Sequence, residues 1–361
     1  MNNFVTTRIQ NRIGFILLDR PKALNSLSLE MIRDITRTLL DWREDPAVRS
    51  ICIHGSHERA FCAGGDIRFF YDVGSATPKG DSALLEDFFT EEYALNHLIH
   101  FYPKPYISLL NGVVMGGGMG IAQAGPDNRL RIVTERTKMA MPEVNIGLFP
   151  DVGGGYFLSR CAGELGTWLG LSGDIINAAD AIYADLADLF LPSEQLAPLI
   201  AHLETTQDTD IRTCIREFAA PYQMPKVAGR LETNRALIDA HFAHNSVSEI
   251  LASLQADSST FAQHTAALML TRSPLMLCVT LEQLRRGTAL NVATCLRLER
   301  NMVRHCFKHG EVLEGVRALV VDKDMQPKWR PATIQEVSEE MVQAFFEPVW
   351  PDYAHPLREL S

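Results

Sequence analysis

Hydrophobic and polar residues follow two different periods along the first third of the chain. Residues 4–10 and 13–18 are short runs rich in Val, Ile, Phe and Thr, separated by turn residues, and they predict a β-hairpin. After Ser28, apolar residues recur at near-helical spacing up to Pro46. Serine is a favoured residue at a helix N-terminus, so this segment predicts an amphipathic helix that begins directly after Ser28.

The next part of the chain predicts buried strands alternating with helices. Residues 48–55 and 106–110 are compact apolar runs typical of strands buried on both faces, and residues 84–101 between them have helical spacing. Strands separated by helices of this length imply crossover connections and therefore an α/β core, whose sheet we expect to be parallel.

From about Glu164 onward the glycines become rarer and the apolar spacing is mostly helical, for example at 275–284 and 292–305. No low-complexity linker interrupts the chain. We therefore expect residues 1–200 to form the α/β core with the active site, and residues 201–361 to form a mainly helical region packed on that core.

One uncharged stretch of twenty residues, 106–125, has about the length that spans a bilayer. Its glycines and Asn111 are unfavourable in a lipid-exposed helix, and they favour a buried strand, a tight glycine loop and a short helix. We expect no membrane association.

Composition and charge narrow the class of protein. With 46% hydrophobic and 22% charged residues, the chain is too apolar to be disordered and too polar to be a multi-span membrane protein. The formal charge is 34 − 44 = −10, which repels a polyanion. A soluble folded protein that does not bind nucleic acid is expected.

The cysteines and histidines give no sign of a disulfide framework or a metal site. The seven cysteines are odd in number and scattered, with no C-x-x-C spacing, and no H-x-x-x-H pair lies near a glycine loop. The first residues lack the apolar core of an export signal. We expect a cytoplasmic protein without a metal or redox cofactor.

Two glycine clusters each follow a predicted strand, at residues 62–66 (CAGGD) and 115–120 (MGGGMG). Glycine allows the backbone to approach a ligand, and amide N–H groups at the first turn of a helix carry partial positive charge. Two such amides that meet at one oxygen would form an oxyanion hole. The alternative is that these glycines only permit tight turns.

Two acids flank an apolar loop that begins at Met141. A carboxyl group among apolar side chains loses hydration, which raises its pKa and suits it to proton transfer. Glu143 follows Pro142 and could instead be an ordinary acid at a helix N-terminus, while Asp151 could be an N-cap residue. Glu92, considered alone, is interpreted as a solvated residue on a helix surface.

Three segments, in this order and spacing, resemble the crotonase (enoyl-CoA hydratase/isomerase) superfamily over most of the chain: AFCAGGDI at 60–67, NGVVMGGGMG at 111–120, and MPE with GLFPDVGGGYFLSR within 141–160. EEYALN at 91–96 and EGVRALVVDKDMQPKWRP at 314–331 are similar to a branch that hydrolyses β-hydroxyacyl-CoA thioesters. The resemblance implies a crotonase-like α/β core of repeated ββα units with a helical C-terminal region.

The resemblance also implies roles for individual residues. Gly65 and Gly117 would be the oxyanion-hole donors to the thioester oxygen. Glu143 would be the catalytic carboxylate and Asp151 its catalytic partner. The residues expected to contact the substrate are Lys22, Ala23, Leu24, Ala63, Asp66 and Glu92.

Enoyl-CoA hydratases carry a second glutamate at the position of Gly120, and usually a small residue at that of Asp151. Because Gly120 cannot orient or deprotonate water, the resemblance favours hydrolysis of a short β-hydroxyacyl-CoA, with CoA entering as part of the substrate. The acyl group, 3-hydroxyisobutyryl or 3-hydroxypropionyl, stays open, and valine breakdown is the pathway implied.

Two alternatives also stay open. One is a hydratase or isomerase of the same superfamily that uses Glu143 alone. The other is a non-catalytic acyl-CoA-binding protein that keeps the fold, which would not need Glu143, Asp151 and two oxyanion glycines together. The superfamily often assembles as trimers or pairs of trimers, so the resemblance is compatible with a homo-oligomer, and the oligomeric state stays open.

Overall fold

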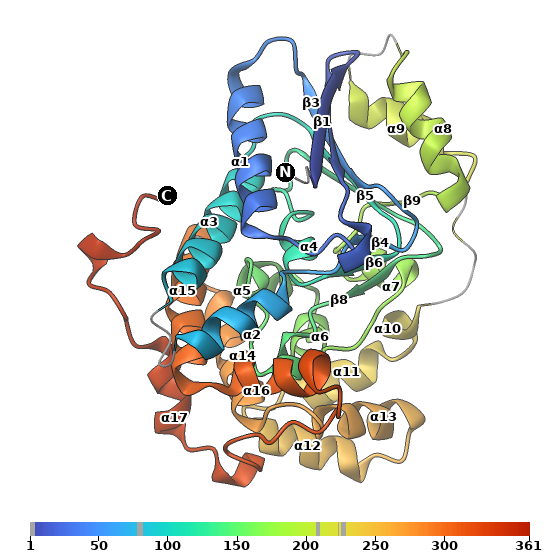
Figure 1. The fold of residues 1–361 in the computed structure, drawn as a ribbon. Coiled ribbons are helices and arrows are strands. Elements are labelled where there is room, and N and C mark those ends of the chain that lie inside the picture. Colours follow the sequence, from blue (N-terminus) through green and yellow to red (C-terminus); the bar gives the residue numbers. More distant parts are fainter. Residues whose placement is uncertain (1–3, 78–81, 207–209, 223, 225–228) are drawn as a thin grey trace. The chain divides into compact units, whose positions relative to one another are not determined.

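The computed structural model describes residues 4–77, 82–206, 210–222, 224 and 229–361 (Figure 1). Its elements fall into two compact units, each made of separated stretches of sequence. Unit 1 comprises the described residues of Met1–Gly65, Leu95–Ala140 and Ile175–Thr233, and unit 2 those of Asp66–Ala94, Met141–Asp174 and Asn234–Ser361. The expected division at residue 200 is a different partition and stays a prediction.

Unit 1 contains two sheets. The six-stranded sheet has the order β1-β2-β3-β5-β7-β9, and the three-stranded sheet has the order β4-β6-β8. The strands are β1 (Val5–Gln10), β2 (Ile13–Leu18), β3 (Ser50–Gly55), β4 (Ala60–Cys62), β5 (Tyr106–Leu110), β6 (Val113–Met115), β7 (Arg129–Val133), β8 (Lys138–Ala140) and β9 (Leu189–Phe190). Among the named strands of the described residues, β1 and β2 pair antiparallel, as the predicted hairpin, and the other strand pairs are parallel.

From β3 to β8, consecutive strands alternate between the two sheets. In each repeat the first strand joins the six-stranded sheet, the second joins the three-stranded sheet, and a helix follows in the sequence. The repeats are β3-β4-α2 (α2, Ile67–Ala76), β5-β6-α4 (α4, Gly117–Gly120) and β7-β8 followed by the 3-10 helix Glu143–Ile146. This ββα pattern confirms the predicted fold class and the strand, glycine loop and short helix predicted for residues 106–125.

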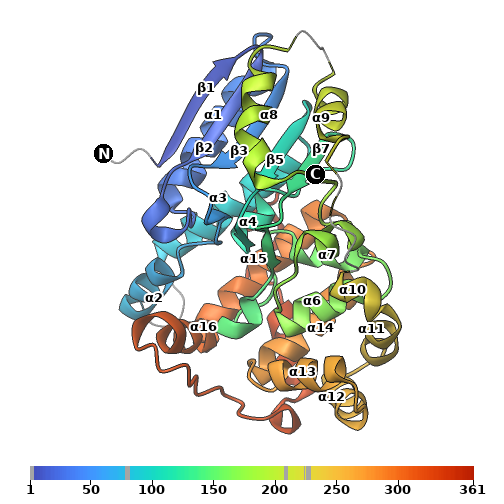
Figure 2. The same cartoon turned by 90° about the vertical axis from the view of Figure 1, so that its right-hand side faces the viewer.

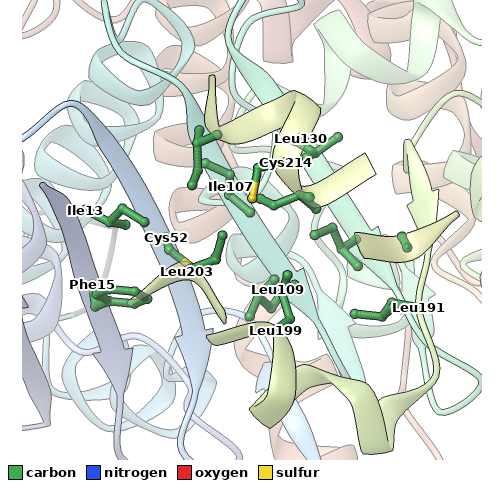
Figure 3. Packing of buried hydrophobic residues seen from close by; sticks show 14 residues of the cluster. Ile13, Phe15, Cys52, Ile107, Leu109, Leu130, Leu191, Leu199, Leu203 and Cys214 are labelled. Carbon is green, nitrogen blue, oxygen red and sulfur yellow. The ribbon is translucent and has the colours of Figure 1, made fainter. Parts of the chain in front are cut away.

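A large buried cluster of unit 1 lies on one face of the six-stranded sheet. Alternate residues of its strands, such as Ile107 and Leu109, point into a buried cluster with Leu199 and Cys214 from the covering helices (Figure 3). In Figure 1, α8 (Leu196–Leu203) and α9 (Ile211–Ala219) lie on one side of this sheet and α1 (Leu29–Glu44) lies on the other. Figure 2 shows α8 in front of the sheet.

Local capping fixes where α1 begins. The Ser28 hydroxyl accepts the Met31 amide N–H at 3.3 Å, so the predicted N-cap is confirmed. The other helices of unit 1 are α7 (Ala178–Tyr183), α10 (Arg230–Thr233) and the last turns of α3 (Ala83–His100).

Every named element of unit 2 is helical within the described residues, which confirms the prediction of a mostly helical carboxyl half. Besides α2 and most of α3, the α-helices are α5 (Gly154–Phe157), α6 (Leu165–Ser172), α11 (Arg235–Phe242), α12 (Val247–Ala256), α13 (Thr260–Met269), α14 (Pro274–Gly287), α15 (Val292–His309), α16 (Glu311–Val316) and α17 (Glu339–Gln343). Among the described helices, none combines the length and apolar character needed to cross a bilayer.

Candidate active site

The two glycine clusters lie against each other in unit 1. β4 and β6 are parallel neighbours, so the loops that follow them leave the small sheet at the same edge. A Cβ atom at Gly64 would lie 3.2 Å from the Met115 carbonyl oxygen and 3.7 Å from the Gly117 amide nitrogen. The φ angle of Gly64 is +104°, which a residue with a side chain rarely adopts. The close approach therefore requires glycine at position 64.

The two predicted donor amides follow these strands directly. Gly117 is the first residue of α4, where an amide has no partner within the helix. Gly65 forms an isolated parallel bridge with Leu27, whose N–H donates to the Gly64 carbonyl at 2.8 Å. In the part of the chain that the structure describes, neither the Gly65 amide nor the Gly117 amide donates a backbone hydrogen bond.

The segment expected to contact CoA lies beside the first glycine loop. Lys22 and Ala23 belong to the short 3-10 helix Pro21–Ala23, and Leu24 ends it with φ 51°. The Ala63 amide donates to the Leu24 carbonyl at 3.0 Å, which joins two parts of the predicted substrate site. The Lys22 side chain is exposed.

Asp66 begins unit 2 and is the N-cap residue of α2. Its Oδ1 accepts the Phe69 amide N–H at 3.2 Å, so its observed contact is structural. A role of Asp66 toward substrate stays a prediction.

Three predicted acids interact in unit 2, where Glu92 comes from a part of the sequence far from Glu143 and Asp151. Glu92, Glu143 and Asp151 are only 2%, 6% and 5% exposed. The interpretation of Glu92 as a solvated surface residue was wrong, because the packing of α3 buries that side of the helix. Within the described residues, Glu92 Oε1 and Glu143 Oε2 are buried without a hydrogen-bond partner.

Glu143 is the first residue of the 3-10 helix that follows Pro142. A helix N-terminus does favour an acid, so the alternative interpretation has a local basis. The helix ends after one turn at Gly147, whose φ of +70° closes the loop. Because Glu143 Oε2 has no hydrogen-bond partner within the described residues, it can accept a hydrogen bond from a bound molecule.

Asp151 is not an N-cap residue, so that interpretation was wrong. The cap position of α5 is Gly153, and the side chain of Asp151 accepts the Tyr93 hydroxyl at 2.7 Å. Val152 and Gly153 have φ angles of +53° and +87°, so the backbone turns sharply after Asp151. This turn directs the Asp151 carboxylate toward α3 instead of the start of α5.

Burial raises the pKa values of all three acids. Burial raises the pKa of Asp151 to about 6. For Glu143 and Glu92, burial raises the pKa well above its usual range and the Asp151 charge raises it further. The charged groups that shift these three pKa values, within the described residues, include no cation. Raised pKa values of this kind suit the cluster to proton transfer.

Sequence reasoning missed a fourth buried acid, Glu299 on α15, which is 1% exposed. Its carboxylate accepts the amide N–H groups of Gly153 at 2.8 Å and Gly155 at 2.9 Å. The Gln283 side chain donates to the same carboxylate at 3.2 Å. Glu299 thus holds the turn that carries Asp151, and no local sequence signal marks it.

Comparison with known proteins supports the fold and the motifs. The family model for enoyl-CoA hydratase/isomerase matches residues 13–346. The chain therefore belongs to the enoyl-CoA hydratase/isomerase family. Within that family it is similar to proteins named 3-hydroxyisobutyryl-CoA hydrolase, mitochondrial: it is 39% identical to those of Xenopus laevis and Homo sapiens over 92% of this chain and 86% of each relative. A cytoplasmic location for this chain stays a prediction.

Two solved structures are similar over nearly the whole chain. One is named a carnitinyl-CoA dehydratase from Mycobacterium thermoresistibile, with a TM-score of 0.89 and 38% identity over 97% of this chain and 98% of that chain. The other is named an enoyl-CoA hydratase from Rhodobacter sphaeroides, with a TM-score of 0.84 and 38% identity over 96% of this chain and 98% of that chain.

Proposed function

We propose that this chain hydrolyses the thioester of a short β-hydroxyacyl-CoA, with 3-hydroxyisobutyryl-CoA as its substrate. The similarity to 3-hydroxyisobutyryl-CoA hydrolases over more than nine tenths of the chain carries this proposal. The buried acids add chemical support, because Glu143 and Asp151 have raised pKa values that suit proton transfer.

In this proposal, the amides of Gly65 and Gly117 stabilise the thioester oxygen. Negative charge develops on that oxygen as the acyl carbon becomes tetrahedral, and fixed amide donors receive it without reorganisation. Support comes from the close approach of the two glycine loops and from the N–H groups of both residues, which donate no backbone hydrogen bond within the described residues.

In this proposal, Glu143 is the catalytic carboxylate, and it can act by either of two routes. Its carboxylate either attacks the acyl carbon, forming an anhydride that water then hydrolyses, or removes a proton from the attacking water. Both routes break the bond between the acyl carbon and sulfur, form a new carbon–oxygen bond at that carbon and consume one water molecule. The CoA sulfur takes up the proton, so the products are a free hydroxy acid and CoA thiol.

Glu92 and Asp151 provide the specificity for the β-hydroxyl group. Glu92 Oε1 is a buried acceptor without a partner in the described residues, and a substrate hydroxyl would supply the missing donor. An acyl-CoA without that hydroxyl would leave the oxygen unpaired, so the site disfavours it.

A second candidate function is hydration of an enoyl-CoA, because the two similar solved structures are named as a dehydratase and a hydratase. Gly120 argues against it. This residue is buried in α4, and because it has no side chain it cannot supply the second carboxylate that would orient or deprotonate water.

The test is a thiol-release assay on purified protein with matched CoA esters. 3-Hydroxyisobutyryl-CoA is compared with isobutyryl-CoA, which differs by the hydroxyl group, and with methacrylyl-CoA, whose double-bond absorbance reports hydration. We expect thiol release from the hydroxy ester and little from isobutyryl-CoA. Loss of double-bond absorbance without thiol release would reject the hydrolase in favour of a hydratase.

A further inference from the structure

The buried hydroxyl of Tyr93 has a different kind of hydrogen-bond acceptor from those of the other fully buried tyrosines in the described residues. Tyr102 donates to the Leu39 carbonyl at 2.9 Å, and Tyr106 donates to the Ile121 carbonyl at 3.1 Å. These are the backbone contacts by which a buried tyrosine is usually satisfied. Tyr93, which is 0% exposed, instead donates to a carboxylate oxygen, Asp151 Oδ2, at 2.7 Å.

The ring of Tyr93 is fixed in its place. It lies on α3 next to Glu92, and its centroid is 6.0 Å from that of Phe89 at an edge-to-face angle of 66°. Phe89 in turn packs against Phe307 of α15, with centroids 5.6 Å apart. Because aromatic packing fixes the ring, the hydroxyl is presented to Asp151 at a defined position.

Arg300 of α15 interacts with Tyr93, whereas within the described residues the titratable groups that interact with Asp151 are all acidic, so Asp151 depends on the Tyr93 donor. Glu92 and Tyr93 face it from α3, Glu143 from the 3-10 helix, and Glu299 and Cys306 from α15. Burial raises the pKa of Asp151, and the Tyr93 hydrogen bond acts in the opposite direction. A hydroxyl donor favours the ionised carboxylate without adding a positive charge.

We propose that Tyr93 is a positioning residue whose hydroxyl orients the Asp151 carboxylate and keeps it ionised for the reaction. The inference rests on the proposed function, in which Asp151 is the partner of Glu143. Removing the hydroxyl leaves a buried carboxylate oxygen without that donor, so Asp151 should take up a proton at higher pH and lose its fixed orientation.

The experiment compares four proteins: the parent, Tyr93→Phe, Tyr102→Phe and Asp151→Asn. Tyr102→Phe is the matched control, because it removes one buried tyrosine hydroxyl that bonds only to a backbone carbonyl. Two quantities are measured for each: the pH dependence of kcat and KM for thiol release from 3-hydroxyisobutyryl-CoA, and the titration of Asp151 by NMR. The NMR sample carries 13C at the aspartate carboxyl, and the Asp151 signal is the one absent from Asp151→Asn.

For Tyr93→Phe we expect kcat to fall about tenfold to a hundredfold with little change in KM. The acid limb of the rate profile and the Asp151 titration should both move to higher pH. Tyr102→Phe should keep the parent's midpoints and kcat. A fall in kcat without a shift in the pH midpoint of the rate profile or of the Asp151 titration would overturn the proposal, because it indicates a merely structural role. A shift of these midpoints without a fall in kcat would also overturn it.

Asp151→Asn tests the catalytic role of Asp151, and Tyr93→Phe tests the positioning role of Tyr93. Parent-like turnover by Asp151→Asn would reject the catalytic role of Asp151, and with it the proposed function of the pair. An inactive Asp151→Asn together with parent-like midpoints and kcat in Tyr93→Phe would reject the positioning role alone. Both tyrosine variants keep their aromatic rings, and comparison of their melting temperatures checks that the folds are equally intact.

Discussion

The carboxylate of Glu299 accepts the amide N–H of Gly153 at 2.8 Å, across 146 residues of sequence. Its second oxygen accepts the amide of Gly155 at 2.9 Å. A helix in the carboxyl half of the chain therefore holds the backbone turn that follows Asp151. The turn contains Val152 at φ +53°, a conformation that a β-branched residue adopts only when its surroundings enforce it.

Replacing this carboxylate should destabilise the protein and slow the reaction. Glu299→Ala leaves two buried amide donors without an acceptor, which costs about 2 kcal/mol or more of unfolding free energy. The loosened turn should also lower kcat by about tenfold, because Asp151 loses its fixed position. Urea unfolding and thiol-release kinetics measure the two effects. Glu282→Ala, which removes a partly exposed carboxylate paired with Arg286, is the control. Equal loss in both variants would contradict the special role of Glu299.

Stability should decrease from mildly acidic to alkaline pH. Burial raises the pKa of Glu299 to about 8, of Glu311 to about 7 and of Asp151 to about 6 in the folded protein. Each group binds its proton more tightly when folded, so its stabilising contribution is complete below its unfolded pKa and is lost as pH rises through its folded pKa. Melting temperatures measured from pH 5 to pH 9 should fall steadily.

The glutamine variant isolates one part of this pH dependence. Glu299→Gln cannot ionise, so its melting temperature should fall less steeply than the parent's up to about pH 8. A parent melting temperature that rises over the same range, or identical slopes for the two proteins, would show that these buried carboxyl groups do not govern the pH response.

Proline at position 117 should remove one oxyanion donor without breaking the helix. Gly117 is the first residue of α4, where proline is tolerated because its missing N–H has no helical partner. If this amide stabilises the thioester oxygen, Gly117→Pro should lower kcat about 10²-fold to 10³-fold. Gly117→Ala keeps the amide and should retain much more activity. Thiol release at equal melting temperature compares them, and equal rates would mean that this amide is not a donor in the reaction.

A substrate with a second negative charge should be rejected. The cluster of Glu92, Glu143 and Asp151 is buried, and no cation shifts its pKa values within the described residues. A β-hydroxyacyl-CoA with a terminal carboxylate, such as 3-hydroxy-3-methylglutaryl-CoA, therefore meets uncompensated repulsion. We expect its kcat/KM to lie at least about 100-fold below that of 3-hydroxyisobutyryl-CoA, and Glu92→Gln to narrow the difference. Comparable rates with the two esters would contradict this electrostatic basis of specificity.

The sequence was most informative where structure depends on nearby residues. The hairpin at 4–18 and the helix after Ser28 follow from residue spacing and capping within a few positions, and the structure confirms both. The glycine clusters were also found from sequence, and their close approach follows from parallel pairing of the strands before them. These features need little knowledge of the rest of the chain.

Burial of the acids could not be predicted in the same way. Glu92 was interpreted as exposed and Asp151, taken alone, as a cap, because both patterns are local and both residue types usually have those roles. Their actual contacts are with groups far away in sequence, since Tyr93 and Asp151 are 58 residues apart. Tyr93 and Glu299 escaped notice for the same reason. The apolar loop marked Glu143 and Asp151 as candidates for proton transfer, and only the family resemblance pointed to Glu92 in advance.

The most direct test of the central claim is single-turnover thiol release from 3-hydroxyisobutyryl-CoA by the parent and by Glu143→Gln. The substitution keeps the size of a buried side chain and removes its ability to act as a nucleophile or base. We expect thiol release to fall at least about 10³-fold while the ester still binds with nearly the parent's affinity. Release at close to the parent's rate would contradict the assignment of Glu143 and the mechanism built on it.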